Sequence, residues 1–361
     1  MKMTVPFLLK DKEDLIVSDV FTNSIEHTNL LPTWNALIYI YQGDLLVYSG
    51  HLYRAMENSL GKAPDLYVGD FWYDFGLWTN TTADAYNPAT TYALNQLCYH
   101  EIGYKHYIYS SNVASNVGNK PSATVGDKWT KVGAVNLYRC LDDKTNNKTA
   151  RTDSLWLRVK TYKADTVALI GIRAKSATIT VYDSLGNVLS TDNRASLQYK
   201  GATSWMSYFF GDFKYKTDIT SQVNLGFNNE VKVEVVNTGN IARLGRLVIG
   251  KSFDIGTTNY GGDSGILDFS LKERDAIFGD ESIKQGNYAD IHSIKVNILT
   301  SRISEIKQFL TSIRGKEVLL NANNGGDYYD YLITYGFVQD FKVIHEGPVM
   351  STLSIKFEGL I

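Results

Sequence analysis

The amino-acid sequence predicts a mostly β, multidomain protein with two small β-modules, a β-sandwich, and a C-terminal β-sheet domain that packs one helix. Three observations predict this fold class. Tyrosine supplies 24 of the 361 residues and proline only 6, a composition that favours strands. A pattern of aromatic and glycine residues occurs twice in the first half. The second half alternates apolar and polar residues in short runs between turn residues.

Length and composition also limit the class of protein. At about 150 residues per domain, 361 residues predict two to four domains. Hydrophobic residues make up 44% of the chain and charged residues 20%, which is enough to bury cores. The net charge of −2 disfavours a nucleic-acid partner. No apolar run approaches the roughly 20 residues of a membrane-spanning helix, so we expect no membrane insertion.

The cysteine content and the first residues bear on where the protein is made. Two cysteines, Cys98 and Cys140, cannot form a disulfide framework. The segment 10–14 is charged where a secretion signal would be apolar. We therefore expect synthesis in a reducing cytoplasm.

The chain divides into six segments. The first contains apolar runs that we expect to pair with a later domain, and the fourth is a polar, aperiodic linker. Between them lie the two modules, and after the linker come the sandwich and the C-terminal domain. The ranges are 1–30, 31–79, 80–141, 142–153, 154–240 and 241–361.

The two modules align over their whole length. Leu46-Val47-Tyr48 matches Leu97-Cys98-Tyr99 at an offset of 51 residues, and Gly61-x-x-Pro64 matches Gly118-x-x-Pro121 at an offset of 57. Eight residues after each proline comes a tryptophan, Trp72 or Trp129. Because such short units have little other core, we expect aromatic side chains to supply much of their packing.

The predicted sandwich rests on alternating apolar runs at 155–159, 177–181 and 231–235. Asp183-Ser-Leu-Gly186-Asn187 predicts a hairpin turn between two strands. Several short strands at this spacing are typical of a β-sandwich.

The C-terminal domain combines strands with one helix. Ile294, Val296 and Ile298 alternate as a strand. A single helical stripe follows, and Gly315 ends it; the stripe consists of Ile303, Ile306, Leu310 and Ile313. Four more strands are expected at 317–320, 331–337, 341–345 and 353–357.

Two motifs match the residue types of a binding site, one for phosphate and one for metal, but both are better explained as ordinary parts of the fold. Gly245–Ser252 matches the letters of a phosphate-binding P-loop, but its middle residues are those of a strand and no helix follows. Cys98, His100 and His106 lack the further ligands that structural zinc requires. We nominate no catalytic residue, no metal ligand and no cofactor, and we expect no enzyme activity.

The aromatic residues of the modules are the strongest candidates for binding, because aromatic faces stack on the C–H faces of sugar rings. The alternative is that they form the modules' own cores. The equivalent places of Trp72 and Trp129 favour the core for that pair. The candidate carbohydrate-binding residues are Trp34, Tyr53, Trp72, Tyr73, Tyr107, Tyr109 and Trp129.

The repeat resembles the small chitin- and cellulose-binding modules of bacterial glycosidases, carbohydrate-binding families 5 and 12. The resemblance implies the module fold and sugar binding. Those modules carry exposed aromatic residues just after the Tyr-x-Ala motif. This chain has Met56-Glu57-Asn58 there in the first copy and Ser110-Ser111-Asn112 in the second, so part of the usual sugar platform is missing. The residues that carry the resemblance are Tyr41, Gly43, Asp44, Val47, Tyr48, Leu52, Tyr53, Ala55, Gly61, Pro64 and Trp72.

The C-terminal part resembles tail proteins of tailed bacteriophages. This resemblance implies a virion component with a sheet-plus-helix architecture like that of tail-tube and distal-tail domains, which assemble into rings. The segments that carry it are 244–261, 268–275, 335–341 and 355–361.

The first hypothesis is therefore a structural protein of the phage tail tip or baseplate, located in the virion. Its expected partners are copies of itself in a ring or trimer, other tail proteins, and a glycan of the host surface. The alternative is a polysaccharide-binding protein associated with glycan degradation. A third reading, a glycosidase, requires a pair of carboxylates across a cleft, which the sequence cannot place.

Overall fold

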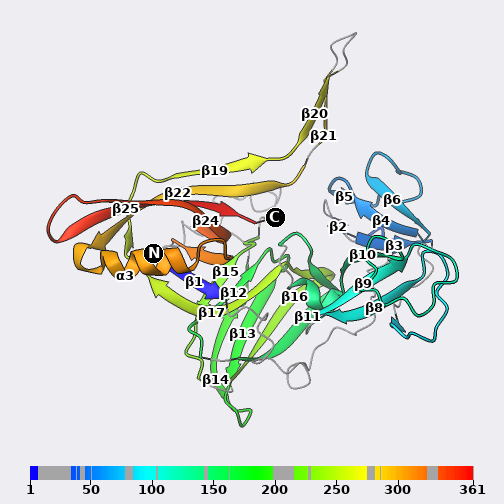
Figure 1. Ribbon diagram of the computed structural model, residues 1–361, viewed down its shortest axis with the longest axis horizontal. Coiled ribbons are helices and arrows are strands. Elements are labelled where there is room, and N and C mark those ends of the chain that lie inside the picture. Colours follow the sequence, from blue (N-terminus) through cyan, green and yellow to red (C-terminus); the bar gives the residue numbers. More distant parts are fainter. Residues whose placement is uncertain are drawn as a thin grey trace, which may run out of the picture.

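The protein is mostly β, as predicted, and its strands form several separate sheets (Figure 1). Its structure is a computed structural model. No helix in the part of the chain that the structure describes is long and apolar enough to cross a membrane. The described residues are 1–6, 34–37, 39–40, 45–49, 51–77, 84–102, 105–141, 145–161, 163–197, 215–226, 229–274, 281–284, 286–322 and 332–360.

Each module is a small set of strands around an aromatic core, and every pair is antiparallel except β7 with β8, which is parallel. In module one, β3-β4-β6 form one sheet and β2-β5 another; in module two the order is β10-β9-β8-β7. The strands of module one are β2 (Tyr39–Ile40), β3 (Leu45–Tyr48), β4 (His51–Ala55), β5 (Ser59–Leu60) and β6 (Trp72–Leu77). Those of module two are β7 (Asp84–Ala85), β8 (Leu97–Ile102), β9 (Lys105–Ser111) and β10 (Trp129–Ala134).

A four-stranded sheet forms one layer of the sandwich. Its order is β11-β16-β13-β14, and the predicted alternating residues of its strands face a common core. Asp183 closes the β13–β14 turn by accepting hydrogen bonds from the main chain of Leu185 and Asn187. The strands are β11 (Thr149–Thr161), β13 (Ser176–Tyr182), β14 (Val188–Arg194) and β16 (Asn229–Leu244).

A ten-stranded sheet forms the rest of the body. Its order is β15-β12-β17-β1-β23-β24-β25-β22-β18, and β19 also pairs with β22. The strands are β1 (Lys2–Pro6), β12 (Thr166–Ile170), β15 (Ile219–Gln222), β17 (Arg246–Asp254), β18 (Thr257–Thr258), β19 (Asp263–Asp268), β22 (Tyr288–Leu299), β23 (Val318–Asn321), β24 (Ile333–Ile344) and β25 (Met350–Gly359).

The predicted helix is α3 (Ile303–Ser312), which packs on this sheet. Ile306, Leu310 and Ile313 are buried against strand residues, so the helical stripe is confirmed. Gly315 follows with a φ of +69°, the left-handed conformation that ends a helix.

The N-terminal strand β1 lies inside the large sheet, antiparallel to β17 on one side and β23 on the other. The second apolar run of the first segment, 15–20, lies outside the described residues.

Two predicted boundaries are wrong. The border at 240 falls inside β16, and β12 of the predicted sandwich is a strand of the large sheet, where it pairs with β15 and β17. The segment 149–153, expected in the linker, is the start of β11 and pairs with β16. Residues 149–152 are mostly polar, which is typical of a linker, but strand pairing uses main-chain groups and does not require apolar side chains.

Two further expectations concern single strands. The strands expected at 331–337 and 341–345 are one strand, β24. Its pairing with β25 shifts register between Val338 and Asp340, within the region where the sequence predicted a break. The P-loop-like letters lie on β17, a regular strand, so the strand interpretation is confirmed.

An arm extends from the body beyond β22 (Figure 1). It consists of β19, the first residues of β22, and the ribbon of β20 (Leu271–Arg274) and β21 (Glu281–Lys284). Gly286 lies at the bend, where a Cβ atom would stand 2.3 Å from the main-chain oxygen of Phe269. Only glycine permits this close approach.

Candidate functional site

The two modules repeat one backbone. Tyr53 pairs with Asp74 in module one as Tyr109 pairs with Lys131 in module two. The indole N–H of Trp72 donates to the main-chain oxygen of Lys62 at 3.0 Å, and that of Trp129 to the oxygen of Asn119 at 2.8 Å. These matched contacts define equivalent positions without reference to side-chain identity.

The pairing corrects the sequence alignment of the first strands by one residue. Leu46 pairs with Tyr53, and Cys98 pairs with Tyr109, so Leu46 corresponds to Cys98 rather than to Leu97. Both side chains are buried in their module cores.

Four of the seven predicted sugar-binding aromatics belong to these cores. Trp72, Trp129 and Tyr109 have no exposed surface, and Tyr53 is 4% exposed. A ring without exposed surface cannot stack on a sugar, so the platform role is wrong for these residues and their alternative as core is correct. Burial raises the pKa of Tyr53, and the nearby carboxylates of Asp74 and Asp65 raise it further.

The other three predicted residues lie elsewhere. Trp34 is half-buried and meets Tyr48 edge-on, with ring centroids 5.2 Å apart. Tyr107 is half-buried at the border between module two and the body core. Tyr73 belongs to β6, but its side chain lies outside the described part of the structure.

One matched position shows how the modules differ. In module one, His51 Nδ1 lies 2.9 Å from a carboxylate oxygen of Asp74. In module two, Tyr107 and Lys131 occupy these places, and the Lys131 ammonium lies 3.4 Å from the centre of the Tyr107 ring. A histidine–carboxylate hydrogen bond and a cation–π pair therefore bridge the same two strands.

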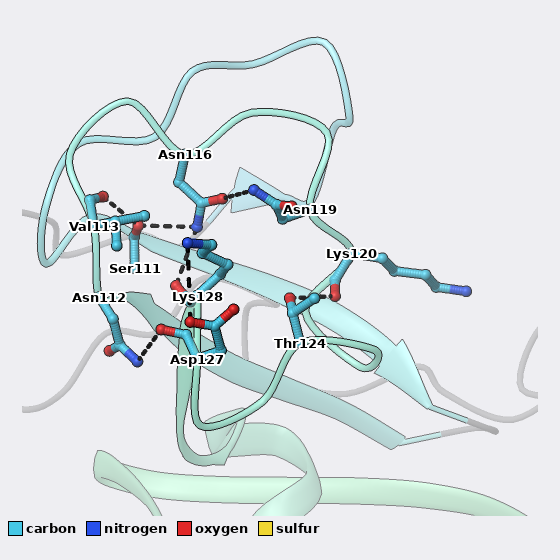
Figure 2. A network of polar contacts seen from close by, with 9 residues as sticks. All are labelled: Ser111, Asn112, Val113, Asn116, Asn119, Lys120, Thr124, Asp127 and Lys128. Atoms are coloured by element: carbon cyan, nitrogen blue, oxygen red, sulfur yellow. Dashed lines mark hydrogen bonds and ion pairs between the residues drawn. The ribbon is translucent and has the colours of Figure 1, made fainter.

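Module two fills the end of its sheet with a network of polar contacts (Figure 2). The buried side-chain amide of Asn116 donates to Ser111 Oγ at 3.0 Å and to the main-chain oxygen of Lys128 at 3.1 Å. Its oxygen accepts from the amide of Asn119 at 2.8 Å. Asn116 thus has its amide N–H groups and its oxygen satisfied within the module, which makes it a structural residue.

Module one has an aromatic cluster at the corresponding place. Tyr67 and Phe71 meet edge-on with ring centroids 5.9 Å apart, and both are half-buried. The Lys62 ammonium lies 4.5 Å from the Tyr67 centroid and 5.3 Å from that of Phe71. Met56 is 37% exposed, and its main-chain N–H donates to the Phe71 oxygen.

Sequence reasoning missed Tyr67 and Phe71. The signal lay in the repeat itself: the residues three and seven positions after each Gly-x-x-Pro proline differ between the copies, being Tyr67 and Phe71 in module one and Thr124 and Lys128 in module two. Main-chain bonds confirm that Tyr67 corresponds to Thr124 and Phe71 to Lys128.

Metal binding finds no support in the described residues, where no group of three or more His, Cys, Asp or Glu side chains could hold an ion. Cys98 is buried, and burial raises the pKa of its thiol to about 12. A thiol that stays protonated is a poor ligand and a poor nucleophile.

No protein-family model matches this chain, and no curated protein matches it. Among solved structures, it is similar to the lectin domain of lectinolysin in complex with Lewis b antigen (TM-score 0.24, 14% identity, 31% of this chain and 82% of that one). It is also similar to a fucose-binding module of Streptococcus pneumoniae (TM-score 0.23, 13% identity, 31% of this chain and 80% of that one). A third similar structure is a chitosan-binding module of a chitosanase/glucanase from Paenibacillus sp. IK-5 (TM-score 0.20, 15% identity, 31% of this chain and 82% of that one).

Proposed function

We propose that this chain is a non-enzymatic structural protein of a bacteriophage tail, at the tail tip or baseplate, that assembles with copies of itself and displays its two modules outward. The observation that carries the proposal is the arm formed by β19 to β22. The resemblance of the C-terminal segments to phage tail proteins supplies the biological setting.

The arm exposes apolar side chains on a thin ribbon. Every residue of β19 is exposed, including Ile266 at 61%, and Phe269 beyond its end is 52% exposed. Leu271 and Tyr288 add to the same segment. A two-stranded ribbon is marginally stable in water by itself, and an open strand edge invites pairing with another chain. Both features favour an arm that is covered in an assembly.

The modules sit at the opposite end of the molecule from α3 (Figure 1). Leu97 and Ile108 of module two share the hydrophobic core of the sandwich with α1 (Asn136–Arg139), so this module is fixed to the body. Module one has a separate core. This arrangement supports a body that assembles and modules that face outward, where many copies would multiply a weak affinity.

The test is the mass of the full chain in solution by light scattering, with electron micrographs of the same sample. We expect a symmetric multiple of the 40.5 kDa chain. Replacing Ile266 and Phe269 together by lysine should reduce the mass to that of one chain.

The matched control is Leu185→Lys, which changes an apolar residue that is 86% exposed on the β13–β14 turn, away from the arm. It should leave the assembly intact. A wild-type protein that stays at 40.5 kDa at high concentration would favour the alternative, a polysaccharide-binding protein without a tail role.

A further inference from the structure

Lys62, Tyr67 and Phe71 of module one form a half-buried cluster that the main-chain fold of the module does not require. Module two keeps the same main-chain bonds with Thr124 and Lys128 in place of the two rings. It also keeps the tryptophan hydrogen bond with Asn119 in place of Lys62. One backbone accepts both sets, so the shared main-chain fold does not dictate the aromatic set.

The two rings offer an apolar contact surface. They stand edge-on to each other, each half-buried at the rim of the core, with the partly exposed Met56 beside Phe71. Leu66, next to Tyr67, is 75% exposed. Partly exposed aromatic rings beside polar groups are typical of sites that bind amphipathic ligands.

The Lys62 ammonium adds a positive charge at the same place. Its contacts with described residues are the two rings alone, with no ion pair or hydrogen bond to its ammonium. The exposed carboxylates of Asp65 and Asp70 lie in the same loop, yet neither pairs with it. The rings hold the cation in position, and its charge stays available to an anion.

We propose that this cluster binds a glycan that carries an anionic substituent, with C–H groups of a sugar ring against the exposed surface of Tyr67 or Phe71 and its carboxylate or phosphate at Lys62. The inference rests on the proposed outward display of the modules and assigns the glycan contact to module one. The anion can belong to a uronic acid or to a sugar phosphate.

The test measures binding of the full chain to two matched pairs of immobilised polymers. The first pair is polygalacturonate and its methyl ester, and the second is a phosphomannan and the same mannan after dephosphorylation. The protein should prefer the anionic member of at least one pair, and the pair it prefers identifies the source of the anion.

Variants locate the site. Lys62→Asn and Tyr67→Thr install residues that module two carries, so both should fold, and each should weaken binding by about tenfold. Lys120→Asn removes an exposed charge from module two and should leave binding unchanged.

Equal binding of neutral and anionic polymers, binding to none of the four, or full binding by Lys62→Asn would overturn the proposal. So would an equal loss in Lys120→Asn. The mass of each sample in solution reports separately on assembly, so a failed glycan site and a failed tail role give different results.

Discussion

Modules one and two use the same backbone to support different chemistry. At the end of the sheet, module one places Lys62 against two aromatic rings, whereas module two joins Asn116, Asn119 and Ser111 in a closed polar network (Figure 2). The network satisfies its members internally, and the aromatic cluster leaves ring surface and charge exposed. The difference separates a module that is complete by itself from one that can receive a ligand.

The two modules also differ in how they are attached to the body. Module two shares the sandwich core, and His106 stacks on Tyr138 of α1 with ring centroids 4.9 Å apart. Among the described residues, the core of module one contains none from the body. Within the described residues, module two is therefore anchored in the body core and module one is not.

The largest expected effect tests the two cores. Trp72→Ala and Trp129→Ala each remove a fully buried indole, which costs roughly 3–5 kcal/mol. Trp72→Ala should unfold module one alone and produce an early, separate transition in calorimetry. Trp129→Ala should instead lower the main transition, because module two is joined to the body core. If Trp72→Ala abolished sugar binding with its unfolding profile unchanged, the platform role of this residue would be restored.

The next effect tests the polar network. Asn116→Ser introduces the module-one residue, Ser59, and removes the side-chain amide that donates to the Lys128 oxygen, which keeps the main-chain N–H of Asn112 as a donor. We expect a loss of about 1–3 kcal/mol in the free energy of unfolding by urea. Ser111→Ala introduces Ala55, the module-one residue at the equivalent position. The double variant should lose less free energy of unfolding than the sum of the two single variants. Strict additivity would show that the network does not act as a unit.

A smaller effect tests the matched pair on the sheet. His51→Tyr and Asp74→Lys each break a partly exposed pair and should cost roughly 0.5–1 kcal/mol. The double variant reproduces the Tyr107–Lys131 pair of module two and should recover about half of the combined loss or more. Urea unfolding of the four proteins measures this coupling, and a double variant that is worse than both singles would deny that the positions are equivalent.

The smallest effect is an absence of reaction. With a pKa of about 12, the Cys98 thiol is ionised to only about one part in ten thousand at pH 8, and its side chain is buried. Iodoacetamide should therefore label Cys98 at pH 8 only after denaturant is added, as mass spectrometry of the peptide would show. Leu46 occupies this place in module one, so Cys98→Leu should leave the module folded. Rapid labelling of the native protein would mean that the core of module two opens.

Much of the fold was predictable because alternation and helical periodicity record which face of an element is buried. Val231, Val233 and Val235 are fully buried, and Ile306, Leu310 and Ile313 of the helical stripe are buried as well. The same patterns do not say which sheet a strand joins. The strand β12 is apolar on both faces, and only its pairing with β17 assigns it to the large sheet.

The candidate site was less predictable, because composition does not distinguish a core aromatic from an exposed one. Tyr109 and Tyr67 are both tyrosines in short strand-and-turn units, yet the first is fully buried and the second is not. The comparison of equivalent positions separates them: Tyr53 and Tyr109 are the same residue in both copies, whereas Tyr67 is replaced by Thr124.

The position of β1 has a consequence for the order of events during synthesis. This strand precedes both modules in the chain, but its neighbours in the sheet are at 250–254 and 319–321. The modules contain all their own strand partners and can close while the ribosome is still translating the body. The large sheet can close only when most of the chain has emerged, and such distant pairing is slow. During that interval the modules would be finished while the body that carries them is still open.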